Sequence, residues 1–109
     1  MTPALVTYAG PDETGGHVAR LTLDSPHNRN ALSTRLVEQL HAGLNRAAAD
    51  PAVRVVVLGH TGGTFCAGAD LSEASGGDPS EATAARARDL ATVLRAIVES
   101  PRPVVAAID

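Results

Sequence analysis

The sequence lacks lysine and tryptophan altogether, and tyrosine, phenylalanine, cysteine and methionine each occur once among its 109 residues. Without lysine the chain has neither a Schiff-base nucleophile nor the residue that holds nucleotide phosphates in a phosphate loop. A single cysteine excludes an internal disulfide. With so few aromatic rings, any core must consist of alanine, valine, leucine and isoleucine, and a chain of this length builds one domain at most.

The chain also lacks any excess of basic residues. Its net charge is −3 at pH 7 and no basic cluster stands out, so nucleic acid is not an expected partner. The four histidines and the cysteine lie too far apart for metal-ligand spacing. No basic start precedes an apolar stretch, and no run approaches the roughly 20 apolar residues of a membrane helix. These absences predict a cytoplasmic protein that binds neither metal nor membrane.

The first half of the chain has the pattern of two strands followed by a helix. Residues 4–9 and 17–24 are predicted strands, and the glycines and proline of residues 10–16 predict a turn, and therefore a hairpin. Ser33 is placed to cap a helix that continues to about Asp50, where the next residue, a proline, ends it. The expected apolar face of that helix contains Leu36, Leu40 and Leu44.

A nearly continuous β-branched run opens the second half. Residues 53–58 are typical of a strand that is buried on both faces, as in a parallel sheet. A glycine-rich loop follows over residues 59–68. Residues 69–74 are expected to form one or two helical turns, and the glycines within residues 75–77 break the chain.

The last part of the chain predicts a helix and a strand. Asp78 is placed to cap a helix that continues to about Glu99, and residues 104–108 form another apolar strand run. If this strand is parallel to the one at 53–58, the helix between them makes a right-handed crossover. The fold class is therefore α/β. The expected apolar stripe of the helix consists of Leu90, Leu94, Ile97 and Val98.

The most specific segment is the glycine-rich loop with the residues that follow it. Small residues at 67–69 allow another molecule to approach the backbone, and N–H groups at a helix start can face a negative oxygen. This is the geometry of an oxyanion hole. Two alternatives stay open at this point. Gly63 to Gly68 has phosphate-loop spacing, although Ala69 and Asp70 replace the required residues, and the segment also fits an ordinary strand-to-helix loop.

Three segments resemble one known family. Residues 65–71 (FCAGADL) resemble the F-[CAS]-[AS]-G-x-D-[LI] signature of the crotonase superfamily, the enoyl-CoA hydratase/isomerase group. Residues 21–33 resemble its L-x-x-P-x-x-x-N-A-L-[ST] opening, and residues 100–109 its P-K-P-V-I-A-A-[VI]-[ND]-G strand. The resemblance implies a crotonase-like (ClpP/crotonase) fold of ββα repeats. Residues 1–109 would be the N-terminal part of a single such domain, truncated after the strand that ends at 109.

The same resemblance implies an acyl-CoA thioester as substrate. The backbone N–H of Ala69 would be one of two donors that hold the thioester oxygen as an enolate forms. Arg29 would contact a CoA phosphate, unless it is a solvated loop arginine. Ser72 replaces a residue that is often basic in the family, and Cys66 is interpreted as a packing residue. The expected CoA-lining residues are Arg29, Asn30, Ala31, Ala67, Gly68, Asp70 and Leu71.

The implied reaction is hydration of 2-enoyl-CoA in fatty-acid or related acyl-CoA metabolism, with CoA present only as part of the substrate. The second oxyanion donor and the acid/base glutamates of the family would lie beyond residue 109. The 109 residues alone would then be inactive, and the full-length protein would be a homotrimer or hexamer. Isomerisation, thioester hydrolysis or carbon–carbon cleavage on the same fold, non-catalytic acyl-CoA binding, and a small α/β domain without CoA chemistry are the alternatives.

The final strand run also predicts a stability problem. The apolar residues of 104–108 would carry surface that needs a cover, so we expect marginal stability and a tendency to associate.

Overall fold

A four-stranded sheet forms the base of the fold. The computed structural model describes residues 4–68 and 79–108. The sheet order is β1-β2-β3-β4, with β1 antiparallel to β2 and the other two pairs parallel. The predicted hairpin, the parallel pairing of the last two strands and the α/β class are therefore confirmed. The strands are β1 (Val6–Ala9), β2 (Val18–Leu23), β3 (Val55–His60) and β4 (Val104–Ala106).

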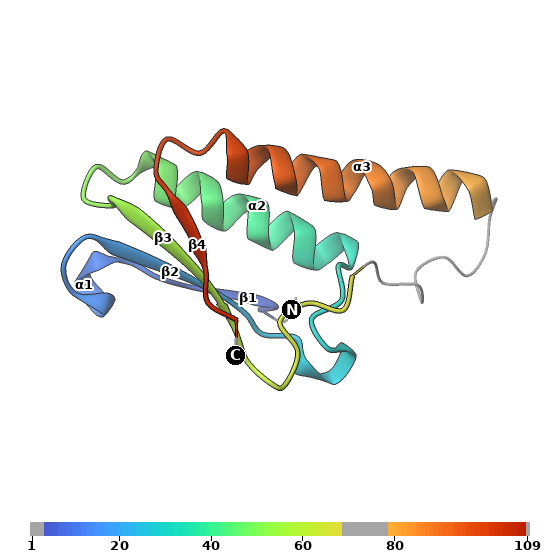
Figure 1. The fold of residues 1–109 in the computed structure, drawn as a ribbon, viewed down its shortest axis with the longest axis horizontal. Coiled ribbons are helices and arrows are strands. Elements are labelled where there is room, and N and C mark those ends of the chain that lie inside the picture. The colour runs from blue at the N-terminus through green and yellow to red at the C-terminus, as the bar shows by residue number, and fades with distance from the viewer. Residues whose placement is uncertain (1–3, 69–78, 109) are drawn as a thin grey trace.

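Two long helices lie on one side of this sheet (Figure 1). The helix α2 contacts β1 and β2, and α3 packs against α2. Two short helical turns, α1 and the 3-10 turn η1, interrupt segments that were expected to be plain turn and loop. No helix in the described ranges is long and apolar enough to cross a membrane. The helical elements are α1 (Pro11–Thr14), η1 (Pro26–Asn28), α2 (Thr34–Ala49) and α3 (Pro79–Val98).

The helix α2 begins and ends as its sequence predicts. The Ser33 hydroxyl accepts a hydrogen bond from the Leu36 N–H at 3.1 Å, which satisfies a donor that the first turn leaves free. The next turns pack on β2 because Gly43 lets the helix come close. A Cβ at Gly43 would collide with the Leu21 side chain. The predicted face is confirmed: Leu36, Leu40 and Leu44 are all buried.

The strand β3 departs from its prediction in two ways. It starts at Val55, two residues later than expected, and buried and half-buried residues alternate from Val55 to Leu58. Val56 and Leu58 face the helices, whereas Val55 and Val57 are half-buried. The expectation of burial on both faces is therefore wrong. The reason is that both long helices among the described elements cover the same face of the sheet.

The helix α3 also buries a different face from the predicted one. Among the α3 residues whose burial is described, Val93 is buried, and Ile97 packs partly against the same core. Leu90, Leu94 and Val98 are instead 43%, 53% and 82% exposed, so three members of the predicted stripe are wrong. The predicted Asp78 cap and the features expected over 69–77 lie outside the described residues.

The edge strand β4 is shorter than predicted and carries exposed apolar side chains. It covers three residues of the expected 104–108, and the exposed fractions of Val105 and Ile108 are 52% and 65%. Leu90, Leu94 and Val98 of α3 are also exposed large hydrophobic residues in the described part of the chain. Apolar side chains exposed in this way favour association when they lie close together.

The exposed apolar side chains of α3 and of the β4 region generate a test of association. We expect the 109-residue chain to self-associate as its concentration rises, and Leu94→Glu to weaken association about tenfold, since it removes an apolar contact and would bury a charge. Sedimentation velocity across a concentration series measures this. The matched control is Ala42→Glu, an exposed position on α2 with the same charge change. A chain that is monomeric at every concentration and unfolds cooperatively contradicts the expectation.

Candidate functional site

Two of the three segments that carry the sequence motifs lie against each other. The Ala67 N–H donates to the Arg29 carbonyl at 3.1 Å, and the Leu32 N–H donates to the Gly68 carbonyl at 2.6 Å. The segments follow β2 and β3, which are adjacent and parallel, so both leave the sheet at the same end (Figure 1). This end, outside the carboxyl ends of parallel strands, is where α/β proteins commonly bind ligands. The structure therefore brings Arg29, Ala67 and Gly68 together.

Asn30 is the buried centre of this contact. Its side chain is fully buried, its Oδ1 accepts from the Ser25 N–H at 2.7 Å, and its Nδ2 donates to the carbonyls of Thr61 and Thr64 at 3.3 and 2.9 Å. A buried carboxamide needs such partners, because an unsatisfied polar group costs ~1–3 kcal/mol. The side chain is thus committed to internal hydrogen bonds. The expected CoA contact stays a prediction for the Asn30 backbone.

The backbone around Asn30 is left-handed. Arg29 and Asn30 both have φ of 56°. This conformation costs an ordinary residue ~1–2 kcal/mol, although asparagine tolerates it better than most. The Arg29 side chain is exposed, which fits both the predicted phosphate contact and the solvated alternative, while Ala31 is 8% exposed. The hydrogen bonds on either side of Arg29 and Asn30 hold the backbone in this strained conformation.

The glycine-rich loop is tied down at its start. The Thr61 hydroxyl donates to the Asp24 carboxylate at 2.9 Å, and the Thr61 N–H donates to the Leu23 carbonyl at 2.9 Å. Gly62 then turns the chain with φ of 72°, and a Cβ there would lie 3.2 Å from the Pro26 Cβ. The loop therefore needs glycine at this position, both for its conformation and for its approach to η1.

The middle of the loop packs inward. Phe65 and Cys66 are partly buried against the hydrophobic core, and the Phe65 ring meets His60 edge-on with centroids 5.6 Å apart. The Gly68 N–H points at the Cys66 sulfur at 3.5 Å. These contacts agree with the interpretation of Cys66 as a packing residue.

The remaining predicted residues cannot be placed in this site. Ala69, Asp70 and Leu71, together with Ser72, lie outside the described residues. Within residues 4–68 and 79–108, no group of three or more histidine, cysteine, aspartate or glutamate side chains could hold a metal ion.

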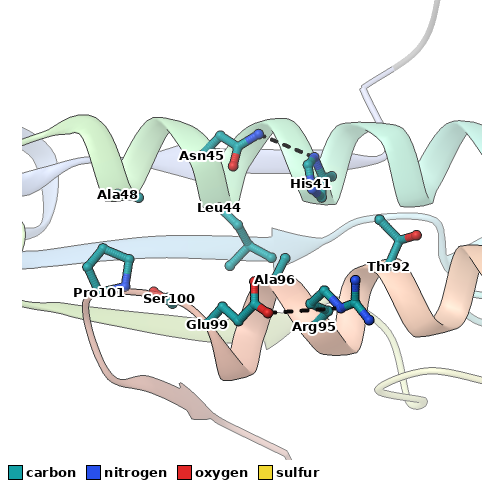
Figure 2. Close-up of a pocket in the computed structure, with 10 residues that line it drawn as sticks. All are labelled: His41, Leu44, Asn45, Ala48, Thr92, Arg95, Ala96, Glu99, Ser100 and Pro101. Atoms are coloured by element: carbon teal, nitrogen blue, oxygen red, sulfur yellow. Dashed lines mark hydrogen bonds and ion pairs between the residues drawn. The ribbon is translucent and has the colours of Figure 1, made fainter.

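Several hollows are lined by residues of α2, and two of them bear on the candidate site. One, of about 520 Å³, adjoins the candidate loop and includes His27 and Arg35, which the sequence motifs did not single out. The other, of about 280 Å³, lies between α2 and α3 (Figure 2). In that second hollow the Asn45 Nδ2 contacts the His41 Nδ1, and the Arg95 Nε lies 3.9 Å from the Glu99 Oε1. Because the Arg95 and Glu99 side chains are 78% and 70% exposed, the second hollow is an open surface groove away from the candidate loops.

A comparison with protein families decides the relationship. A model of the family described as enoyl-CoA hydratase/isomerase matches residues 13–109. The chain belongs to this family. Among curated relatives, it is 48% identical over 67 residues to the probable enoyl-CoA hydratase EchA14 of Mycobacterium tuberculosis, which covers 60% of this chain and 26% of that protein. It is 42% identical over 93 residues to the probable enoyl-CoA hydratase echA6 of Mycobacterium bovis, covering 84% and 35%.

Solved structures of family members share the fold. The crystal structure of an enoyl-CoA hydratase from Mycobacterium avium superposes with a TM-score of 0.87 at 65% identity, over 99% of this chain and 40% of that one. An enoyl-CoA hydratase from Bacillus anthracis gives a TM-score of 0.86 at 30% identity, over 96% and 40%. The described elements are thus part of the crotonase fold. The chain spans well under half the length of these relatives.

The tight turn at Gly62 provides a test of the loop geometry. Gly62→Ala should lower the free energy of unfolding by about 1–2 kcal/mol, because alanine is strained at positive φ and its Cβ presses on Pro26. Denaturant unfolding followed by circular dichroism measures it. Gly63→Ala is the matched control, since a Cβ at the neighbouring glycine meets nothing within 4 Å. Equal stability of the two variants contradicts the argument.

Proposed function

We propose that this protein acts on acyl-CoA thioesters and that its reaction is the hydration of 2-enoyl-CoA in fatty-acid or related acyl-CoA metabolism. The observation that carries the proposal is the main-chain pairing of two segments, 29–32 and 67–68, at one end of the sheet, in a chain that belongs to the enoyl-CoA hydratase/isomerase family. Both segments carry motifs of that family. The relatives' names support hydration over the other crotonase-fold reactions.

In the proposed mechanism the loop presents backbone N–H groups to the thioester oxygen. The Ala69 N–H is one donor, and a second comes from a later part of the domain. Water adds across the double bond while glutamates deliver and remove protons, and the two donors stabilise the enolate. Removing a donor of this kind typically costs about 10²–10³ in rate. Asp70 and Leu71 continue the proposed CoA path beyond Ala67 and Gly68.

The proposal divides the work between this chain and the rest of the domain. The chain spans 26–40% of the length of the relatives cited above, so we place residues 1–109 in the N-terminal part of a crotonase-like domain. They supply CoA-binding backbone and one oxyanion donor. The acid/base groups, and assembly into a homotrimer or hexamer, belong to the rest of the protein. A cytoplasmic location is part of the same proposal.

Binding is the first test. We expect the 109-residue chain to bind crotonyl-CoA in isothermal titration, and Arg29→Ala to weaken binding about fivefold, as expected for a solvent-exposed ion pair worth ~1 kcal/mol. The matched control is Arg54→Ala, because Arg54 is exposed and precedes β3 at the opposite end of that strand. Unchanged affinity in Arg29→Ala supports the solvated alternative for this side chain. A folded chain that binds no crotonyl-CoA overturns the proposed function.

Activity is the second test. The 109-residue chain should not hydrate crotonyl-CoA, whereas a protein that continues this chain with the rest of a family domain should. The loss of absorbance of the conjugated thioester measures the reaction. Hydration by the 109 residues alone contradicts the assignment of the acid/base groups to another part of the protein.

A further inference from the structure

The Asn30 side chain connects its own turn to the glycine-rich loop. Its Oδ1 binds the Ser25 N–H within its own turn, and its Nδ2 binds the Thr61 and Thr64 carbonyls of the glycine-rich loop. The partners therefore demand an acceptor on one side and a donor on the other. A carboxamide offers one acceptor and two N–H donors in one plane, which matches the Ser25 N–H and the two carbonyls. Full burial excludes water as a substitute.

These bonds hold the glycine-rich loop upstream of the residues proposed to face the thioester. Thr61 and Thr64 lie near the start of the loop, and Ala67 and Gly68 near its end. The loop end is bound to the residues on either side of Asn30: Ala67 to the Arg29 carbonyl, and Gly68 to the Leu32 N–H. A displacement of Asn30 would therefore move the start and the end of the loop together.

The backbone of Asn30 adds a second requirement. Its φ of 56° is a conformation that glycine and asparagine accept and that aspartate also tolerates. Backbone and hydrogen-bonding requirements can thus be separated by substitution. Glycine keeps the backbone and loses the side-chain bonds. Aspartate keeps the backbone and the acceptor toward Ser25, and it places an oxygen where the Nδ2 donor was.

We infer that Asn30 is a positioning residue of the acyl-CoA site: it sets the placement of the Ala67 and Gly68 backbone without its side chain touching the substrate. The inference rests on the proposed function for the identity of the ligand. It gives the Asn30 side chain a role through the neighbouring loop, beside the predicted place of Asn30 among the CoA-lining residues. The hydrogen bonds of Thr61 to Leu23 and Asp24 hold the start of the same loop against the end of β2.

The experiment compares Asn30→Asp and Asn30→Gly with the 109-residue chain under conditions where each is fully folded. Amide NMR reports the chemical shifts of Ala67 and Gly68 and the hydrogen exchange of Ala67 and Leu32. Isothermal titration reports the affinity for crotonyl-CoA. The matched control is Asn28→Asp, which makes the same chemical change two residues away, where the Asn28 Oδ1 only accepts from the Ser25 hydroxyl.

We expect both Asn30 variants to exchange the Ala67 and Leu32 amides at least tenfold faster, with shifted Ala67 and Gly68 resonances and at least tenfold weaker crotonyl-CoA binding. The Val56 amide, which bonds to the Pro103 carbonyl in the sheet, should keep its protection, because a local role leaves the sheet intact. Asn28→Asp should stay within twofold on every measure. Asn30→Gly provides the comparison if Asn30→Asp does not fold.

Two results overturn the inference. The Asn30 variants could match Asn28→Asp on every measure, or they could lose loop protection while keeping full affinity, which would make Asn30 a structural residue only. Failure of the unsubstituted chain to bind crotonyl-CoA is a different result. It overturns the proposed function and with it the acyl-CoA role of Asn30, while the exchange data still report whether Asn30 holds the loop.

Discussion

The parallel pairing of β2 with β3 is the constraint on which the rest of the structure depends. It is continuous from Val18 opposite Val55 to Leu23 opposite His60. Because the strands are parallel, a crossover must connect them, and α2 provides it. The same pairing makes the segments after Leu23 and after His60 leave the sheet side by side. Thr61 extends the contact by one more hydrogen bond to Leu23. The candidate site is therefore a consequence of strand direction before it is a consequence of loop sequence.

The close packing of α2 maintains that arrangement. Gly43 lets the helix approach Leu21 at the centre of β2, and the leucines of α2 fill the space between helix and sheet. The helix α2 holds the edge strand β1 through a side chain: Gln39 accepts hydrogen bonds from the Leu5 and Val6 N–H groups. Tyr8 adds its ring beneath the Arg46 guanidinium, 4.0 Å away, and burial raises the pKa of its hydroxyl. One helix thus positions both β1 and β2.

Sequence reasoning succeeded where the determinant was local. The Ser33 cap depends on residues three apart, and the hairpin depends on the turn between its strands. Reasoning failed where the partner was distant. The stripe predicted for α3 identifies hydrophobic side chains, but it does not show which neighbouring element covers the helix. Val93 was therefore not singled out. The role of the Asn30 side chain was hidden for the same reason, since its partners Thr61 and Thr64 are more than 30 residues away.

The two motif segments are joined mainly by main-chain atoms. The bonds given above between 29–32 and 67–68 run between backbone N–H and carbonyl groups, and the Asn30 carboxamide binds the loop earlier, at Thr61 and Thr64. Such bonds do not depend on which side chains stand at Arg29, Leu32 or Ala67. Backbone hydrogen bonds thus fix the geometry of the candidate site, whereas the side chains determine the chemistry of its surface. A chain built this way can exchange the side chains at these positions while the backbone of the two segments stays where it is.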